Sequence, residues 1–274
     1  MPFDVEARVL ANTRLSADYH VIALDAPAIA AAMAPGQFVM VKPTLGLDPL
    51  LRRPFSVFEV LRDASGTPLG ISILSKRVGV GTAMLYALER DDRVACLGPL
   101  GRPFTPVDPP TQAWMIAGGV GLAPFATLAE ALAARGTATT LFYGGRSATD
   151  LYYLEFFDRL GVAPVLTTED GSRGEWGLVT APLERACAAL TPLERVMLYI
   201  CGPTRMMHVA ARIAAAHRLP AQVSLEQVMG CGLGGCYSCV VLQRSDDGRP
   251  EYVRSCLAGP VFSAERIVWE ALVH

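Results

Sequence analysis

Four cysteines near the end of the chain constrain its fold more than any other feature of the sequence. Cys231, Cys236 and Cys239 have the spacing C-x4-C-x2-C, and Cys256 follows after sixteen intervening residues. Four thiolates with this spacing hold a [2Fe–2S] cluster in plant-type ferredoxins, which requires the chain to bring them to one point. The loop "GCGLGGCYSC" is rich in glycine, the residue that adopts positive φ at least cost. The spacing therefore predicts a [2Fe–2S] centre held by these four residues.

A structural zinc site is the alternative, because zinc also takes four cysteine ligands. Zinc sites more often have paired short spacings, and the three-plus-one arrangement fits them less well. Cys96, Cys187 and Cys201 stand apart from the four. We expect the first two to behave as small buried hydrophobic residues.

Composition excludes several classes of protein. The 274 residues carry 24 Lys and Arg against 26 Asp and Glu, so no basic surface for nucleic acid is predicted. Hydrophobic residues make up 51% of the chain, which argues against disorder. The start, "MPFDVEARVL", lacks the cationic and apolar segments of a secretory signal. We expect a cytoplasmic protein, where thiols are kept reduced and serve metal or redox chemistry.

The apolar pattern divides the chain into three predicted domains. Residues 1–104 have short apolar runs separated by Gly, Pro and Asp, with one helical stretch, "GTAMLYALER", which predicts a small antiparallel β-barrel. Residues 105–220 alternate between strand and helix patterns, which predicts an α/β domain with a parallel sheet covered by helices on both faces. Residues 221–274 form a compact segment with the cysteines. The long uncharged stretch 112–129 contains three glycines and a proline, so we interpret it as strand, turn and helix and expect no membrane span.

Two motifs of the first predicted domain could bind a pyrophosphate. "RRPFS" lies on a predicted strand, and "SKRVGVGT" leads into the helix. Arg pairs with phosphate oxygens, and a helix that starts behind a Gly-rich turn presents free N–H groups. Taken alone, each motif is weak evidence, because an Arg-Pro before a strand is more commonly a solvated edge and a G-x-G-T is more commonly a simple turn.

Two motifs of the second predicted domain lie at strand ends. "AGGVGLAPF" follows a buried strand and opens a helix, and "CGP" ends a later strand. Ligands of open α/β folds bind at this carboxyl edge of the sheet, although glycine there also serves turn geometry alone. The first motif differs from the G-x-G-x-x-G fingerprint.

The order of these motifs resembles the ferredoxin reductase superfamily of flavin and nicotinamide enzymes. With "CGLGGCYSC" and "SCLAGPVF" added, the chain resembles the electron-transfer subunits of NAD-linked, heteromeric dihydroorotate dehydrogenases over nearly its whole length. The resemblance implies three cofactors: FAD, NAD and the [2Fe–2S] cluster. It implies the cluster ligands Cys231, Cys236, Cys239 and Cys256; FAD contacts at Arg53, Pro54, Phe55, Ser56, Leu74, Ser75, Lys76, Gly81 and Thr82; and NAD contacts at Gly118, Gly119, Gly121, Pro124, Cys201, Gly202 and Pro203. Phe55 departs from the tyrosine that the superfamily commonly has there.

The expected function is an electron relay. The resemblance implies a partner, the FMN-containing catalytic subunit that oxidises dihydroorotate in pyrimidine biosynthesis, with two copies of each subunit. Electrons would pass from this partner to the cluster, then to FAD, and leave as hydride to NAD⁺. Because cofactors carry this chemistry, we expect no catalytic acid or base among the residues.

Two other functions stay open at the level of sequence. One is a related flavin and iron–sulfur subunit of a hydrogenase, sulfur reductase or transhydrogenase complex, because surface residues define the partner. The other is a nucleotide-binding regulatory module with structural zinc. The choice between NAD and NADP is also open. Arg146, after a predicted strand, is positioned for a 2′-phosphate, but an arginine in such a loop is more often solvated, and the resemblance favours NAD.

Overall fold

The computed structural model describes residues 1–272 and divides the chain into two compact units, which we describe one at a time. The first unit comprises residues 1–103, 226–240 and 254–260. The second comprises residues 104–225, 241–253 and those from 261 onward. The predicted segment 221–274 is thus shared between the units, and its last two residues lie outside the described part. Its division into a third domain stays a prediction.

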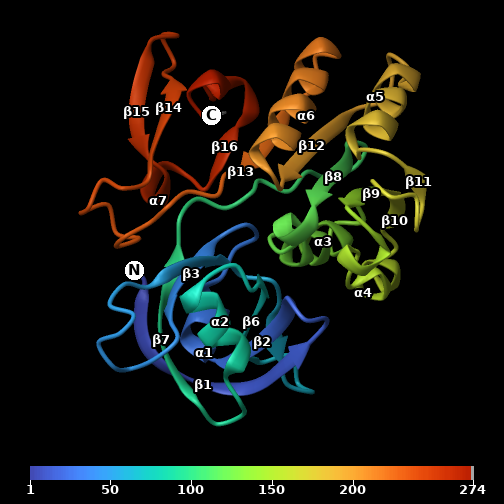
Figure 1. The fold of residues 1–274 in the computed structure, drawn as a ribbon. Helices are drawn as coiled ribbons and strands as arrows, with labels where there is room; N and C mark the ends of the chain where they lie inside the picture. Colours follow the sequence, from blue (N-terminus) through green and yellow to red (C-terminus); the bar gives the residue numbers. More distant parts are fainter. Residues whose placement is uncertain (273–274) are drawn as a thin grey trace. The chain divides into compact units, whose positions relative to one another are not determined.

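The first unit is an antiparallel sheet of seven strands in the order β4-β3-β7-β1-β2-β6-β5, which confirms the predicted antiparallel barrel domain (Figure 1). Apolar side chains that alternate along these strands fill the interior, with Ile22, Leu24 and Ile71 fully buried. The strands are β1 (Phe3–Arg14), β2 (Tyr19–Asp25), β3 (Phe38–Lys42), β4 (Arg53–Ser56), β5 (Val60–Arg62), β6 (Pro68–Lys76) and β7 (Arg93–Leu100).

Residues 1–103 of this unit contain two helices, whereas the sequence predicted one there. The predicted helix is α2 (Val80–Ala87), which begins after Gly79. The helix that the prediction missed is α1 (Pro27–Ala32), where Pro27 takes the first helical position and Ile29 is buried. Six residues are too few for a helical period to emerge from the sequence.

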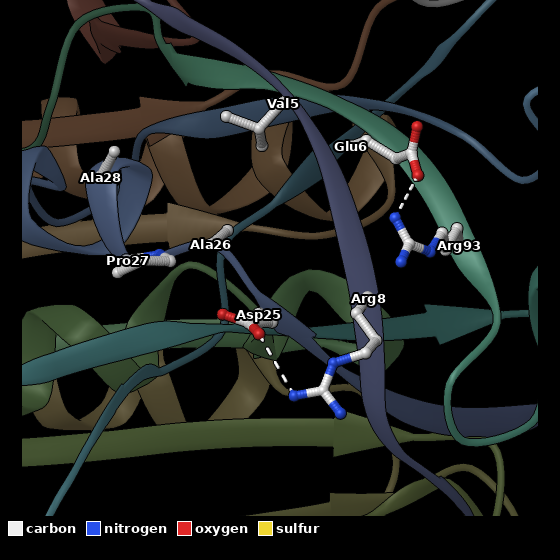
Figure 2. A pocket seen from close by; sticks show the side chains of 8 residues that line it. All are labelled: Val5, Glu6, Arg8, Asp25, Ala26, Pro27, Ala28 and Arg93. Carbon is white, nitrogen blue, oxygen red and sulfur yellow. Dashed lines mark hydrogen bonds and ion pairs between the residues drawn. The ribbon is translucent and has the colours of Figure 1, made fainter.

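A surface pocket of about 390 Å³ lies between β1, β2, β7 and the start of α1 (Figure 2). Its charged side chains are paired: Arg93 Nη1 lies 2.5 Å from Glu6 Oε1, and Arg8 Nη2 lies 3.3 Å from Asp25 Oδ2. None of the predicted site residues lines this pocket.

The second unit contains the predicted parallel sheet, in the order β11-β10-β9-β8-β12-β13-β16. Helices α3 and α4 cover one face and α5 and α6 the other, as predicted (Figure 1). The parallel strands are β8 (Gln112–Gly118), β9 (Thr139–Gly145), β10 (Ala163–Thr168), β11 (Glu175–Trp176), β12 (Val196–Cys201) and β13 (Ala221–Ser224). The helices are α3 (Phe125–Ala133), α4 (Leu154–Arg159), α5 (Thr180–Ala189) and α6 (Thr204–Ala216).

Residues beyond 221 complete this sheet and add a hairpin. β16 (Val261–Ser263) pairs antiparallel with β13, a long-range pairing that local pattern does not reveal. β14 (Val240–Arg244) and β15 (Pro250–Arg254) form a two-stranded sheet, and α7 (Ser255–Ala258) follows directly. Within residues 1–272, no helix combines the length and apolar character that a membrane crossing requires.

Candidate functional site

The flavin motif "RPFS" forms β4 in the first unit, next to the start of α2. The Arg53 side chain passes this start so closely that a Cβ added at Gly81 would lie 3.6 Å from Arg53 Cγ. Arg53 Nη1 donates to Leu51 O at 2.8 Å, which holds the guanidinium near its own strand. The structure thus brings together the two motifs that the sequence predicted for one pyrophosphate. Free N–H groups of a helix start and an adjacent guanidinium favour an anion at this place.

Thr82 closes the turn before α2. Its hydroxyl oxygen accepts the N–H groups of Val78 at 2.9 Å and Gly79 at 3.0 Å, and the hydroxyl lies 3.0 Å from Gly79 O. The geometry gives Thr82 a role in shaping the helix start. Direct contact between its side chain and FAD stays a prediction.

The three predicted FAD contacts on β6 differ in their surroundings. Leu74 and Ser75 are buried, and Ser75 Oγ has no hydrogen-bond partner among the described residues. The Lys76 ammonium lies over the Tyr19 ring, 4.9 Å from its centre. In β4, Pro54, Phe55 and Ser56 are half-buried, and Phe55 packs on the barrel core. Their role toward FAD stays a prediction.

In the second unit, the two glycine motifs meet at the carboxyl edge of the parallel sheet. β8 and β12 are parallel neighbours, and their ends approach so closely that a Cβ at Gly121 would lie 2.3 Å from Cys201 O. Gly202 has a φ of +152°, and a Cβ there would lie 2.9 Å from Gly118 N. Only glycine tolerates such contacts. The predicted convergence of "GGVG" and "CGP" is therefore present.

This convergence lies where open α/β sheets bind nucleotides. From β8 the chain adds strands β9 to β11 on one side, and then β12 on the other, so the strand order reverses between β8 and β12. Such a switch point creates a crevice at the carboxyl ends of the strands. Gly119 has a φ of +54°, and Pro124 precedes the first turn of α3. The sequence missed Met206, whose sulfur would lie 2.7 Å from a Cβ at Gly118, because an apolar residue on a helix gives no signal of a site.

The four predicted cluster ligands lie in the segments of the first unit that follow residue 225. Cys239 and Cys256 are buried and pack with Met40 and Leu100 of the barrel, whereas Cys236 is exposed and Cys231 is half-buried. The thiols are neighbours in two pairs, Cys231 with Cys236 and Cys239 with Cys256, and the members of each pair affect one another's ionisation. The backbone supports the second pair, since Ser255 N donates to Cys239 O at 2.8 Å.

Ser238 is a residue of this loop that the sequence analysis missed. Its hydroxyl accepts the N–H of Gly230 at 2.9 Å and lies 3.2 Å from Cys236 Sγ. The hydrogen bond with this hydroxyl is the main reason that the pKa of Cys236 is lowered to about 6. Burial is the main reason that the pKa of Cys256 is raised to about 12. The signal was present as the serine between two cysteines in "CYSC".

Arg254 is a second residue that sequence reasoning missed. Its Nη1 donates to Gly234 O at 2.6 Å, and its guanidinium lies 4.6 Å from the centre of the Tyr237 ring. Tyr237 has a φ of +57°, so the arginine secures a strained turn between two cysteines. Its place shortly before Cys256 was the available signal.

The donor set fits an iron–sulfur cluster. Two pairs of thiols match two irons that each take two cysteine ligands, and Leu233 N donates to Cys231 Sγ at 3.3 Å, as backbone groups do toward cluster sulfurs. Across residues 1–272, no three Cys, His, Asp or Glu side chains already converge on a single metal position. The structure therefore shows the two pairs of thiols and the segments that carry them. It does not show four thiols arranged around one metal position in residues 1–272.

Two family models match the chain, one over the parallel-sheet domain and one over the segment with the four cysteines. The model described as the oxidoreductase NAD-binding domain matches residues 115–212, and the iron–sulfur cluster binding domain of dihydroorotate dehydrogenase B matches residues 226–268. A curated relative from Desulforamulus reducens, named dihydroorotate dehydrogenase B (NAD(+)), electron transfer subunit, is 37% identical over 97% of this chain and 98% of its own length. A relative of the same name from Geobacillus kaustophilus is 34% identical, over 96% and 98%. This chain belongs to that family of electron transfer subunits.

Solved structures of reductases are similar to this chain in fold. A chain from the structure of an NADH-dependent reduced ferredoxin–NADP oxidoreductase has a TM-score of 0.83 at 24% identity, and covers 98% of this chain and 91% of its own. A ferredoxin NADP⁺ reductase from Neisseria gonorrhoeae, solved with FAD and NADP, has a TM-score of 0.61 at 18% identity, over 78% and 91%. At such identities the likeness confirms the ferredoxin reductase-like fold that the sequence predicted. The match of residues 226–268 to an iron–sulfur cluster binding domain also favours an iron–sulfur cluster over a structural zinc ion at the four cysteines.

Proposed function

We propose that this chain accepts electrons from an FMN-containing catalytic subunit that oxidises dihydroorotate, and delivers them to NAD⁺. One observation carries the proposal: two pairs of cysteine thiols lie in the two segments of the barrel unit that follow residue 225, in a chain related over nearly its full length to electron transfer subunits. When bound, a [2Fe–2S] cluster and FAD would together exchange single electrons for the electron pair that NAD⁺ accepts.

The residues of this chain bind and orient these groups. Cys231, Cys236, Cys239 and Cys256 would hold the cluster. Arg53 and the start of α2 would neutralise the FAD pyrophosphate, because Arg53 lies beside Gly81 and the N–H groups of the first turn. Pro54, Phe55, Ser56, Leu74, Ser75, Lys76 and Thr82 would complete the flavin site. None of them would act as a catalytic acid or base.

The nicotinamide nucleotide would bind at the switch point of the parallel sheet. Gly118, Gly119 and Gly121 let the backbone approach a pyrophosphate closely, and the N–H groups before α3 favour its charge. Cys201, Gly202 and Pro203 would line the nicotinamide end of the crevice, and Pro124 would fix the entry into α3.

The assembly is part of the proposal. We expect two copies of each subunit and a cytoplasmic location, where cysteine thiols stay reduced until they bind iron. The catalytic reaction requires the partner, so this chain alone would catalyse only the NADH side of the relay.

The test compares this chain alone with this chain co-expressed with the catalytic subunit encoded in the same genome. Cofactor-loaded chain alone is expected to reduce an artificial dye with NADH and to leave dihydroorotate unchanged, whereas the complex is expected to reduce NAD⁺ with dihydroorotate. Cys231→Ser is expected to keep NADH–dye activity and to lose dihydroorotate–NAD⁺ activity in the complex. Cys187→Ser, which alters a buried cysteine on α5, is the matched control. Full dihydroorotate–NAD⁺ activity of the chain alone would overturn the proposal.

A further inference from the structure

A buried hydroxyl next to the predicted cluster ligands lacks a hydrogen-bond partner. Ser255 is fully buried at the start of α7, directly before Cys256, and its Oγ has no partner among residues 1–272. Its backbone is held on both sides, because Ser255 N donates to Cys239 O at 2.8 Å and Gly259 N donates to Ser255 O at 2.9 Å. The residue is therefore fixed in place while its hydroxyl stays unsatisfied.

The pairing of β14 with β15 places this hydroxyl on the same face as a cysteine sulfur. Near the tip of the hairpin, Ser245 N donates to Arg249 O at 2.8 Å. The same antiparallel register continued to the base of the hairpin puts Cys239 opposite Ser255, which is where the hydrogen bond from Ser255 N to Cys239 O lies. Directly opposite residues of an antiparallel pair have their side chains on one face, with Cβ atoms roughly 5 Å apart. Cys239 is buried as well, so both side chains lie on the buried face.

The core beside Ser255 offers no nitrogen or oxygen side-chain atom to this hydroxyl. Cys239 and Cys256 share this core with side chains that consist of hydrocarbon and thioether alone: Phe38, Met40, Leu97, Leu100 and Met229. A hydroxyl buried there gives up its hydrogen bonds to water without a replacement, which is unfavourable. Alanine would occupy the place without this cost. The hydroxyl therefore points to an acceptor that the loaded site supplies.

A bound [2Fe–2S] cluster would provide that acceptor. Its sulfurs carry negative charge, and a serine O–H rotates to suit an acceptor. Ser255 adjoins two of the four cysteines that would hold the cluster, one along the chain and one across the hairpin. Hydrogen bonds to the sulfurs are among the factors that set the reduction potential of a cluster. Reduction adds one electron and one negative charge without making or breaking a bond, so a donor stabilises the reduced form more than the oxidised form.

We propose that the Ser255 hydroxyl donates a hydrogen bond to a sulfur of the bound cluster and thereby raises its reduction potential. The inference rests on the proposed function, because it requires a [2Fe–2S] cluster at the four cysteines. A higher potential makes the cluster a better acceptor of electrons from the catalytic subunit and a weaker donor to FAD. Ser255 thus sets how the driving force is divided between these two electron transfers.

The test is an anaerobic redox titration of the cofactor-loaded complex, followed by the electron paramagnetic resonance signal of the reduced cluster. Ser255→Ala is expected to shift the equilibrium toward the oxidised cluster by about tenfold, which lowers the potential by about 59 mV for one electron. Ser255→Gly, which also lacks the hydroxyl, is expected to give the same shift. Ser255→Thr retains the hydroxyl and is expected to stay within about twofold of wild type in this equilibrium.

Thr167→Val is the matched control. Thr167 Oγ1 is likewise buried without a partner among the described residues, but Thr167 lies on β10 in the second unit. Loss of this hydroxyl is expected to leave the cluster potential unchanged. An equal shift in this variant would show that the potential responds to any lost hydroxyl.

A second measurement uses wild type alone, so it does not depend on the folding of a variant. Hydroxyl protons exchange rapidly with D₂O, whereas amide protons in stable hydrogen bonds exchange slowly. After a brief soak in D₂O, electron–nuclear double resonance of the reduced cluster is expected to show the loss of one proton coupling and the gain of a deuteron coupling.

Three results would overturn the inference: a folded, loaded Ser255→Ala or Ser255→Gly protein with the wild-type potential, an equal shift in Thr167→Val, or a wild-type cluster that keeps all its proton couplings after the soak. Failure of the proposed function looks different. Wild type would then contain no iron and sulfide and give no cluster signal, or its cluster would titrate normally but stay oxidised when the complex receives dihydroorotate.

Discussion

At the scale of single residues, His20 is a buried titratable group that lies outside the predicted sites. It is fully buried on β2, its Nδ1 lies 2.7 Å from Asn12 Oδ1, and its ring meets the edge of Tyr86. Its Nε2 has no hydrogen-bond partner within residues 1–272. Burial, with a smaller effect of the Arg14 charge, lowers the pKa of His20 to about 4. The fold therefore holds this imidazole neutral.

A pH dependence of stability follows from this shift. Between pH 6.5 and 4 the unfolded chain binds a proton at His20 and the native chain does not, so stability is complete above about pH 6.5 and falls as the pH is lowered. From pH 6.5 to 5, wild type is expected to lose about 2 kcal/mol of unfolding free energy that His20→Gln does not lose. Urea titrations at both pH values measure this difference. His217→Gln, at the end of α6, should retain the wild-type dependence, and an equal dependence in His20→Gln would contradict the interpretation.

The same scale shows where sequence reasoning succeeds. Cys96 and Cys187 were expected to be buried, and both are; burial raises their pKa values to about 12 and about 11. The convergence of Arg53 with Gly81 also followed from motif order. The Asn12 contact of His20 depends on side-chain geometry, which the local sequence does not encode.

At the scale of elements, one glycine of the cysteine loop is needed both for the backbone turn and for the close packing of the loop against the barrel. Gly232 has a φ of +72°, and a Cβ there would lie 2.6 Å from Met40 Cγ on β3 and 3.1 Å from Leu100 Cδ1 on β7. The sequence analysis predicted glycines for the turn, but the fit of Gly232 against the barrel is a long-range contact. Similarly, α1 is too short for its period to be detected, and β16 joins the sheet only through pairing with β13.

We expect Gly232→Ala to disturb this loop selectively. The positive φ and the close contact together cost on the order of 2 kcal/mol, so the loop should shift away from β3 and β7. The purified variant should contain less iron and sulfide per chain than wild type, with an unchanged FAD content. Gly235→Ala is the matched control, because a Cβ there meets nothing within 4 Å. Equal iron in both variants would show that the loop tolerates the shift.

At the scale of the whole molecule, the two compact units assign the cysteine segments to the barrel. Residues 226–240 and 254–260 belong with residues 1–103, and Met229, Cys239 and Cys256 share a core with Phe38 and Leu97. The sequence analysis predicted a separate domain for residues 221–274, and that division stays a prediction. Chain order alone does not show which neighbour a short segment packs against.

Removal of the cluster should therefore loosen one unit and leave the other intact. Chelation of iron under anaerobic conditions takes away the bonds that would tie Cys239 and Cys256 to the rest of the loop, and these two side chains form part of the core under β3 and β7. Amide hydrogen exchange is expected to become faster in β3 and β7 and to stay unchanged in β8 and β12, whose core lies in the second unit. Reconstitution with iron and sulfide is the control and should restore slow exchange. Faster exchange confined to residues after 220 would instead support an independent cluster domain.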